Sequence, residues 1–367
     1  MIRSLLPSLA LCGVVAVAGA QPASAPTWAP ALDSITRVAL ARTGTPGVQI
    51  AVVQEGRLVY ERAFGVADIE SGRPATTRTL FRIGSLTKMI TAATVLELVA
   101  AGQLDLQAPI GRYVPEIAAR GVGRVTTHQL LTHTAGWRDQ ATPWGRMGEG
   151  ALGEVFREVT DTLFIAAPGE RFAYSNPGYS MVGYVVERAG GARFAAQVER
   201  RVLRPAGMMR STFRPLEVMT TDFSQGHAGA AAMAPTVVRP FTENTAQWSA
   251  GFLLSTAGEL ARFALLLMDG GSIDGQRVLA PTTVPQLTTG QVALPQDSSA
   301  RYGYGLIIGT RDGVRRWRHA GGIPGFLSTI TLWPDQRAAV IVLGNRDATP
   351  LPEIERFVAT QVMRGGR

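Results

Sequence analysis

The stretch Gly47-Val48-Gln49-Ile50-Ala51-Val52-Val53 predicts a β-strand, and a turn and a second strand follow it at once. The turn is Glu55-Gly56-Arg57, and the second strand is Leu58-Val59-Tyr60-Glu61-Arg62-Ala63. The two strands therefore form a hairpin. A helix is predicted ahead of the hairpin, from Leu32 to Ala41.

The C-terminal end of the chain has the same pattern of strands and turns. Short strands separated by turn residues are predicted there, and a final helix runs from Pro352 to Met363. The predicted strands are Tyr304 to Thr310, Val314 to His319, Phe326 to Trp333 and Ala338 to Leu343.

The segment between these two ends, about residues 85–295, has mostly helical patterns, long loops and no repeat with a period of roughly 20 to 50 residues. We expect antiparallel strands from both ends to form one sheet covered by the two terminal helices, with the helical region packed beside it. This is an α+β fold, an α/β sandwich, in a single domain of residues 31–365. Its sheet part is about 31–84 and 296–365, and a functional cleft is expected where sheet and helices meet.

Residues 1–20 have the features of a secretory signal peptide. Arg3 precedes an apolar run at residues 5–17, and Ala18-Gly19-Ala20 is a small-x-small cleavage site. Cleavage after Ala20 is expected, with Ala25 as the alternative, and residues 21–30 form a leader. The run is too short to span a bilayer comfortably, so we expect a periplasmic or secreted protein with no membrane span.

Charge and cysteine content argue against nucleic-acid binding, disulfides and cysteine metal sites. The chain has 36 basic and 28 acidic residues, a net +8, and without Arg3 the balance is 35 minus 28, or +7. The arginines are scattered or alternate as on a strand, so no nucleic-acid partner is expected. Cys12, the only cysteine, lies in the signal, so neither disulfides nor cysteine metal sites are expected in the mature protein.

Lys88 is the only lysine among those 36 basic residues, and it follows Ser85 by three positions in Gly84-Ser85-Leu86-Thr87-Lys88. Arginine supplies a permanent charge but cannot accept a proton, whereas a buried lysine can. Met89 to Ala100 predicts a buried helix, which places Ser85 and Lys88 on one face near its N-terminus. We infer a serine nucleophile with its base. The alternative is an ordinary N-cap serine and a surface lysine.

Two further segments carry candidate site residues. Tyr174 and Asn176 lie two apart beside a Pro-Gly turn, where a phenol near a cation can exchange a proton and an amide offers a donor and an acceptor. His319 ends a predicted strand and precedes Gly321 and Gly322, which allow a ligand to approach closely. Both segments could equally be a turn and a strand end with satisfied side chains.

His128 and His133 flank Leu130-Leu131-Thr132. Their spacing of five does not suit zinc, and no acidic partner is suitably placed. Both are interpreted as structural, and no metal or other cofactor is expected.

Together these segments resemble the ordered motifs of the class C β-lactamase and penicillin-binding-protein-like serine hydrolases, over about residues 35–360. The matching motifs are Ser85-Leu86-Thr87-Lys88, Leu130-Leu131-Thr132-His133-Thr134-Ala135-Gly136, Tyr174-Ser175-Asn176, Gly251-Phe252-Leu253-Leu254-Ser255-Thr256 and His319-Ala320-Gly321.

This resemblance implies roles for the matching residues. Ser85 would be the nucleophile, Lys88 and Tyr174 would share its proton, and Asn176 would position the substrate. The N–H groups of Ser85 and Gly322 would form the oxyanion hole. His319, Gly321 and Gly322 would line the substrate site of a protein that we expect to be a monomer.

The third motif departs from the family pattern, because β-lactamases of this type usually carry Lys-Thr-Gly where this chain has His319-Ala320-Gly321. The charge and hydroxyl that hold a β-lactam carboxylate are absent, and a charge-assisted hydrogen bond contributes about 1.5 to 3 kcal/mol. His-x-Gly is similar to D-alanyl-D-alanine carboxypeptidases, D-amino-acid peptidases and esterases of the family. An esterase or D-specific peptidase is therefore favoured. A true β-lactamase and a penicillin- or peptidoglycan-binding protein that acylates with little turnover remain alternatives.

Overall fold

The computed structural model describes residues 25–140, 146–231, 233–241 and 243–365. The signal peptide expected at residues 1–20 lies outside these ranges, as does the first part of the leader expected at 21–30. Within the described ranges no helix combines the length and the apolarity needed to cross a membrane.

The main feature is an antiparallel sheet of eight strands in the order β2-β1-β14-β13-β12-β11-β10-β9. The hairpin at the start of the chain is confirmed, and β1 also pairs with β14, with Val48 opposite Gly344. Strands from both ends of the chain therefore share one sheet, as expected. The bounds are β1 Gly47–Gln54, β2 Arg57–Gly65, β9 Val292–Leu294, β10 Asp297–Tyr302, β11 Ile307–Arg311, β12 Val314–Ile323, β13 Phe326–Trp333 and β14 Ala338–Gly344.

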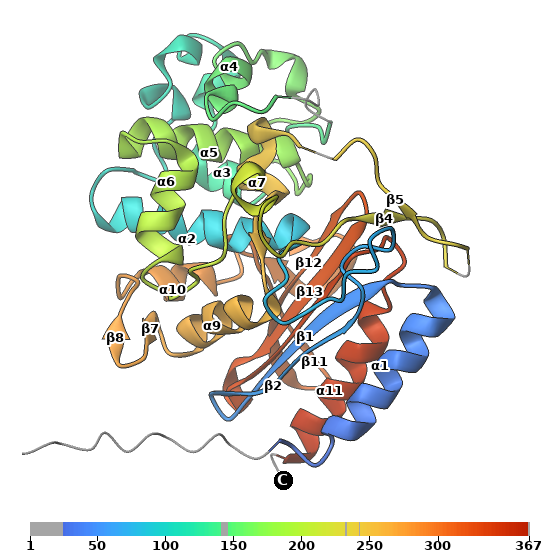
Figure 1. Ribbon diagram of the computed structural model, residues 1–367. Helices are drawn as coiled ribbons and strands as arrows, with labels where there is room; N and C mark the ends of the chain where they lie inside the picture. The colour runs from blue at the N-terminus through green and yellow to red at the C-terminus, as the bar shows by residue number, and fades with distance from the viewer. Residues whose placement is uncertain (1–24, 141–145, 232, 242, 366–367) are drawn as a thin grey trace, which may run out of the picture.

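Helices cover both faces of the central strands (Figure 1). On one face α1 (Ala29–Thr43) and α11 (Leu351–Gly365) lie side by side, over a cluster that includes Ile50 and Val52. On the other face α9 (Ala257–Met268) packs on β1 and β14, over a cluster that includes Ala51 and Val53. Both alternate sets of side chains on β1 are thus buried, which explains its apolar run Ile50-Ala51-Val52-Val53, and the buried polar Gln49 before it bonds the Thr76 and Thr79 carbonyls.

The helix α9 corrects one expectation, because the helical region lies beside the sheet and also supplies the cover for one face. A second correction concerns the edge of the sheet. β9 and β10 lie at 292–302, and β9 falls in the part expected to be helical. The strand expected from Tyr304 begins only at Ile307, since Gly303 N–H bonds the Leu306 carbonyl (2.7 Å) and Gly305 has φ +73°.

A third correction concerns β12, which was expected to end at His319 but continues to Ile323. Its glycines remain in the ladder, with Gly321 opposite Ser328 and Gly322 opposite Leu327 on β13. The strand therefore contains the whole third motif, His319-Ala320-Gly321.

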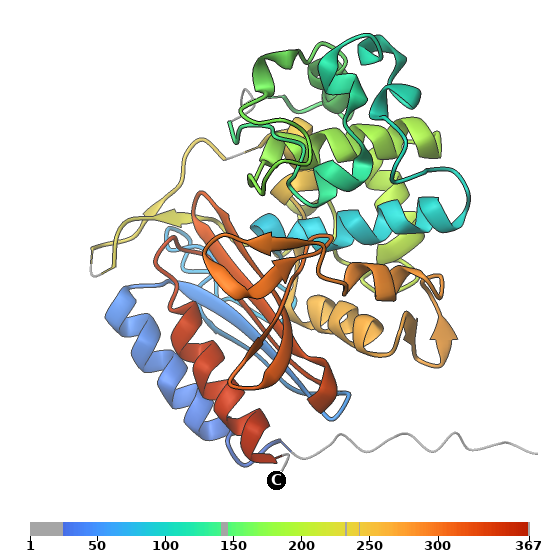
Figure 2. The ribbon, with the colours of Figure 1, turned by 180° about the vertical axis from the view of Figure 1, so that it is seen from behind.

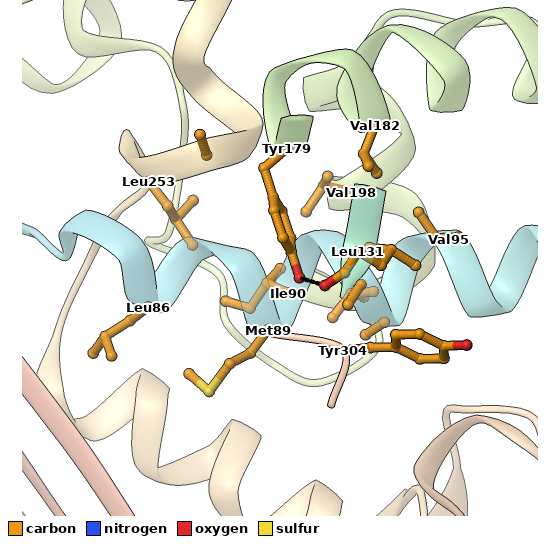
Figure 3. Packing of buried hydrophobic residues seen from close by; sticks show 14 of the residues in the cluster. Leu86, Met89, Ile90, Val95, Leu131, Tyr179, Val182, Val198, Leu253 and Tyr304 are labelled. Atoms are coloured by element: carbon orange, nitrogen blue, oxygen red, sulfur yellow. Dashed lines mark hydrogen bonds between the residues drawn. The ribbon is translucent and has the colours of Figure 1, made fainter. Parts of the chain in front are cut away.

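The helical part is built around α2 (Thr87–Ala100), which is buried over most of its length. Figure 3 shows Ile90 and Val95 of α2 among side chains from the neighbouring helices, including Val182 and Val198. Figure 2 shows this part from behind, joined to the sheet along the side where α2 lies.

The remaining elements are short connections and small ladders, apart from α5. The α-helices are α3 Thr127–Leu131, α4 Ala151–Phe156, α5 Asn176–Gly190, α6 Phe194–Val198, α7 Pro215–Val218, α8 Trp248–Gly251 and α10 Thr283–Leu287. The two-residue strands are β3 Phe81–Arg82, β4 His227–Ala228, β5 Thr236–Val237, β6 Leu254–Ser255, β7 Ser272–Ile273 and β8 Gln276–Arg277. The single-turn helices are η1 Gly84–Leu86, η2 Ile110–Arg112, η3 Pro115–Ile117, η4 Gly121–Arg124, η5 Asp161–Leu163, η6 Glu199–Leu203, η7 Thr245–Gln247 and η8 Pro334–Gln336.

Candidate active site

Ser85 lies in η1, the tight turn that leads directly into α2. The turn begins at Gly84, whose φ of +53° is a conformation that other residues rarely adopt. Ser85 is half-buried, whereas Lys88 one turn further on is fully buried. The i to i+3 spacing brings Lys88 Nζ to 3.1 Å from Ser85 Oγ, as the sequence predicts.

Burial lowers the pKa of Lys88 to about 7, because the apolar surroundings disfavour the charged form more than the carboxylate of Asp139 favours it. Two acceptors hold Nζ from other directions, Asn176 Oδ1 at 2.7 Å and the Ala250 carbonyl oxygen at 2.6 Å. A neutral amine has two N–H groups and one lone pair. With both N–H groups engaged by these acceptors, the lone pair is left to face Ser85 Oγ.

Tyr174 and Asn176 are brought to the same point by the loop that enters α5. Ser175 is the N-cap of this helix, since its side chain accepts a bond from Gly178 N–H, and Asn176 is the first helical residue. The Tyr174 hydroxyl donates to Ser85 Oγ at 2.9 Å, and burial raises the pKa of Tyr174. In this geometry Tyr174 is a proton donor. Lys88, whose pKa lies near 7, is the proton acceptor.

Asp139 was not identified from the sequence, and it fixes the amide of Asn176. Its Oδ1 accepts from Asn176 N–H at 2.9 Å and its Oδ2 accepts from Nδ2 at 3.4 Å. Because a carboxylate only accepts, the amide nitrogen must face Asp139 and the amide oxygen must face Lys88.

The strand β12 passes directly against η1. An ideal Cβ on Gly321 would lie 2.2 Å from the Ile83 carbonyl oxygen and 3.0 Å from Ser85 N, and one on Gly84 would lie 2.7 Å from Gly322 N. Only glycine permits this approach. The backbone N–H groups expected to form an oxyanion hole, those of Ser85 and Gly322, therefore belong to segments in close contact.

His319 is buried on the other side of β12 from Ala320. Its Nε2 lies 3.2 Å from the Tyr302 hydroxyl and its Nδ1 lies 2.6 Å from the Ala320 carbonyl oxygen. Burial, with the nearby charge of Lys88, lowers the pKa of His319 to about 3, so the ring is neutral near pH 7.

His133, interpreted as structural, lies buried behind Tyr174, with ring centroids 4.2 Å apart. His128 lies apart from this group and bonds Tyr304 at 2.8 Å. Among the described residues no group of three His, Cys, Asp or Glu side chains could hold a metal ion.

A hollow of about 350 Å³ opens beside this group of side chains. It is lined by Tyr174, Tyr302, His319, Ala320, Phe172, Leu294, Ile307, Gln296, Asp297 and Arg318. Six of these ten residues are apolar or aromatic. The arrangement offers an activated hydroxyl, a proton acceptor, a proton donor and a space for a substrate group.

Comparison with the sequences of known proteins finds relatives that include an esterase and a penicillin-binding protein. Esterase EstB of Burkholderia gladioli is 38% identical over 194 residues, which are 48% of this chain and 49% of the esterase. The match therefore spans only about half the length of that relative. Penicillin-binding protein 4 of Amycolatopsis lactamdurans is 29% identical over 82% of this chain and 81% of its own length.

Among solved structures, the octameric penicillin-binding protein homologue from Pyrococcus abyssi has a TM-score of 0.79 at 26% identity, covering 91% of this chain and 77% of its own. A class C β-lactamase has the same fold, with a TM-score of 0.74 at 18% identity and coverage of 91% and 95%. The beta-lactamase family model matches residues 32–362. The chain therefore belongs to the β-lactamase family and is a serine hydrolase of that family.

Proposed function

We propose that the protein is a periplasmic or secreted hydrolase that cleaves esters, or peptide bonds next to D-amino acids, through an acyl-enzyme on Ser85. The observation that supports this most directly is the environment of Lys88. Two fixed acceptors engage its N–H groups and burial brings its pKa to about 7, so the free lone pair faces the Ser85 hydroxyl.

In this mechanism Lys88 Nζ takes the proton of Ser85 as Oγ attacks the substrate carbonyl carbon. The Ser85 and Gly322 N–H groups stabilise the oxyanion. Tyr174 then gives its proton to the departing alcohol or amine and recovers one from Lys88, which leaves the acyl group on Oγ. Water attacks this ester in the second half-reaction, and its proton returns through the same two groups to Ser85.

The neutral ring of His319 supports an ester over a β-lactam as the substrate. A β-lactam carboxylate is held by a charge in relatives with Lys-Thr-Gly, and here that position carries a buried, uncharged imidazole. The name of the related esterase EstB points in the same direction.

Within this proposal, one observation favours the peptide substrate, which carries a carboxylate as a D-alanyl peptide does. Arg318 lies on the same face of β12 as Ala320 and lines the hollow. Its guanidinium is 3.8 Å from Asp297, so a substrate carboxylate would have to compete with that partner. Arg318→Gln should then lower the rate on D-alanyl peptides and leave neutral aryl esters unaffected.

The test is Ser85→Ala, assayed with short-chain aryl esters, D-alanyl peptides and a chromogenic cephalosporin. We expect turnover and labelling by a fluorophosphonate to be lost together, with a fall in rate of about 10⁴ to 10⁶. Ser71→Ala, an exposed serine bonded to Asp68, is the matched control. Labelling that survives in Ser85→Ala would place the nucleophile elsewhere.

Intact-mass spectra separate a hydrolase from a penicillin-binding protein that turns over slowly. A hydrolase returns to the unmodified mass within the assay, whereas a slow binder keeps the acyl mass. The same samples, analysed by light scattering, test whether the protein is a monomer.

A further inference from the structure

Two buried histidines and a tyrosine form a chain of hydrogen bonds behind the proposed nucleophile. His133 Nε2 lies 3.2 Å from the Tyr302 hydroxyl, and that hydroxyl lies 3.2 Å from His319 Nε2. All three side chains are almost completely buried. His133 follows α3, Tyr302 ends β10 and His319 lies in β12, so the chain joins three separate parts of the fold.

Backbone groups at the two ends determine which atoms of this chain carry protons. At one end Ser175 N–H donates to His133 Nδ1 at 3.0 Å, so that nitrogen must be the acceptor. At the other end His319 Nδ1 faces the Ala320 carbonyl oxygen at 2.6 Å, so that nitrogen must carry the proton. Neither backbone group can reverse its role.

The roles in the middle follow from the ends. A neutral imidazole has one N–H and one lone pair, and burial lowers the pKa of both histidines below the usual range. His133 therefore donates from Nε2 to the Tyr302 oxygen, and Tyr302 donates to Nε2 of His319. The nearby Tyr179 hydroxyl gives its own proton to the Leu131 carbonyl (2.9 Å, Figure 3), so it is not a donor to His319, and its oxygen is a second acceptor beside the Tyr302 hydroxyl.

Both ring nitrogens of His319 are thus engaged within the protein, and neither is left for a substrate. The chain instead connects the two segments that must act on the same carbonyl group. Ser175 lies between Tyr174 and Asn176, and His319 lies three residues before Gly322 on β12.

We propose that Tyr302 and His133 are positioning residues that hold the neutral His319 ring through its Nε2 and thereby set the spacing between the Tyr174-Ser175-Asn176 segment and the strand bearing Gly322. This inference rests on the proposed function of those two segments. It assigns His319 a structural link where a lysine of related enzymes would supply a charge.

The first test is the tautomer of each ring, measured by ¹⁵N NMR on the histidine-labelled protein without substrate. The chain has four histidines, so single His→Gln variants assign every signal. We expect an Nδ1–H ring at His319 and an Nε2–H ring at His133. In Tyr302→Phe the His319 ring should keep its Nδ1–H, which the Ala320 carbonyl fixes, but the ¹⁵N signal of its Nε2 should shift because the hydrogen bond from Tyr302 is lost. An Nε2–H or protonated His319 ring in the wild type at neutral pH would overturn the proposal.

The second test is kinetic and uses an aryl ester. Tyr302→Phe should lower kcat about tenfold with little change in KM, because orientation in the transition state is lost and binding is kept. Tyr304→Phe is the matched control, since Tyr304 is also buried but bonds His128 away from this chain. His319→Gln, which keeps an acceptor for Tyr302, should retain more activity than His319→Leu.

These outcomes separate the two proposals. A wild-type protein that hydrolyses neither esters nor D-alanyl peptides and takes no label on Ser85 would refute the proposed function, while the NMR result would stand on its own. An active enzyme in which Tyr302→Phe equals wild type, or in which Tyr304→Phe falls equally, would refute the positioning role. Thermal melting of each variant, compared with wild type, identifies any loss of rate that is due to unfolding.

Discussion

Lys88 determines the protonation state in which the site can act. An unperturbed lysine is charged far above neutral pH, whereas burial brings the pKa of Lys88 to about 7. Below that pH Nζ is an ammonium group without a lone pair and cannot accept the proton of Ser85. Above that pH the neutral amine can accept the proton of Ser85, so activity should rise with pH.

We therefore expect kcat/KM for an aryl ester to rise between about pH 5 and 9, with a midpoint near the pKa of Lys88. Lys88→Arg should be nearly as inactive as Lys88→Ala at every pH, because arginine keeps the charge and cannot release the proton. A flat profile, or a Lys88→Arg enzyme that keeps more than about a tenth of the wild-type rate, would remove lysine from the proton-transfer step.

The third motif allows a prediction about specificity. In His319→Lys with Ala320→Thr, the charge and hydroxyl that would hold a β-lactam carboxylate are restored. The ratio of cephalosporin to ester hydrolysis should rise about ten to a hundredfold, since the new charge-assisted bond acts on only one substrate. The ester rate itself should fall, because Tyr302 loses its acceptor.

Measuring kcat/KM for both substrates, in the double variant and in His319→Lys alone, decides this point. The single change should give the smaller shift in ratio. An equal change for ester and cephalosporin would mean that the segment does not distinguish the carboxylate.

Among the structural elements, η1 and β12 must approach closely for the site to form. Gly321 lies where a side chain would meet both the Ile83 carbonyl and Ser328, whose hydroxyl bonds that carbonyl at 2.7 Å. The position is buried, and its backbone conformation is an ordinary one for a strand. The lack of a side chain there thus serves the contact between elements.

Gly321→Ala should therefore push β12 away from η1 and lower kcat about 100-fold, the loss expected when reacting groups shift by an ångström. Gly148→Ala, at an exposed position with open space around it, should change kcat little. Circular dichroism and thermal melting of both variants show whether the fold is kept. Wild-type kcat in Gly321→Ala would show that the contact has no role in the chemistry.

Some of these features could be predicted from the local sequence and others could not. The i to i+3 spacing of Ser85 and Lys88 and the strand-turn-strand pattern of the β1 hairpin are short-range patterns, so both could be predicted. Tyr302 could not, because its bond to His133 joins positions 169 apart and depends on how β10 meets α3.

Two further features were not predicted, the start of α5 and the role of Asp139. The start of α5 was interpreted only as a turn, although Ser175 followed by Pro177 is an N-cap signal that could have located it. Asp139 had no such signal, because its role depends on a contact with Asn176 that is 37 positions away.

At the scale of the whole molecule, a buried ion pair between Arg82 and Glu243 connects two distant parts of the chain close to the site. Arg82 Nη2 bonds Glu243 Oε2 at 2.8 Å, and Trp248 Nε1 donates to the other carboxylate oxygen at 2.7 Å. The Arg82 guanidinium also lies over the Phe241 ring, 4.4 Å from its centroid. The pair joins β3, which leads into η1, to the segment that leads into α8.

Glu243→Gln should destabilise the protein by about 3 kcal/mol, because it leaves the buried Arg82 charge without its counter-ion. Chemical unfolding curves measure this change. Glu70→Gln, which breaks an exposed pair with Arg239, is the control and should barely shift the midpoint. Equal shifts in the two variants would mean that burial does not govern the Arg82 pair.

The pairing of β1 with β14 has a consequence for how the chain acquires its structure during synthesis. Gly47 N–H bonds Asn345 Oδ1 at 2.7 Å across 298 positions, so the centre of the sheet cannot form until the last strand has left the ribosome. Until then the apolar hairpin has an open edge and an uncovered face, which favours aggregation or chaperone binding. A nascent chain in this condition remains unfolded enough to be threaded through a translocon, as the proposed export requires. The site around Ser85, which needs β12 against η1, would then form only after export.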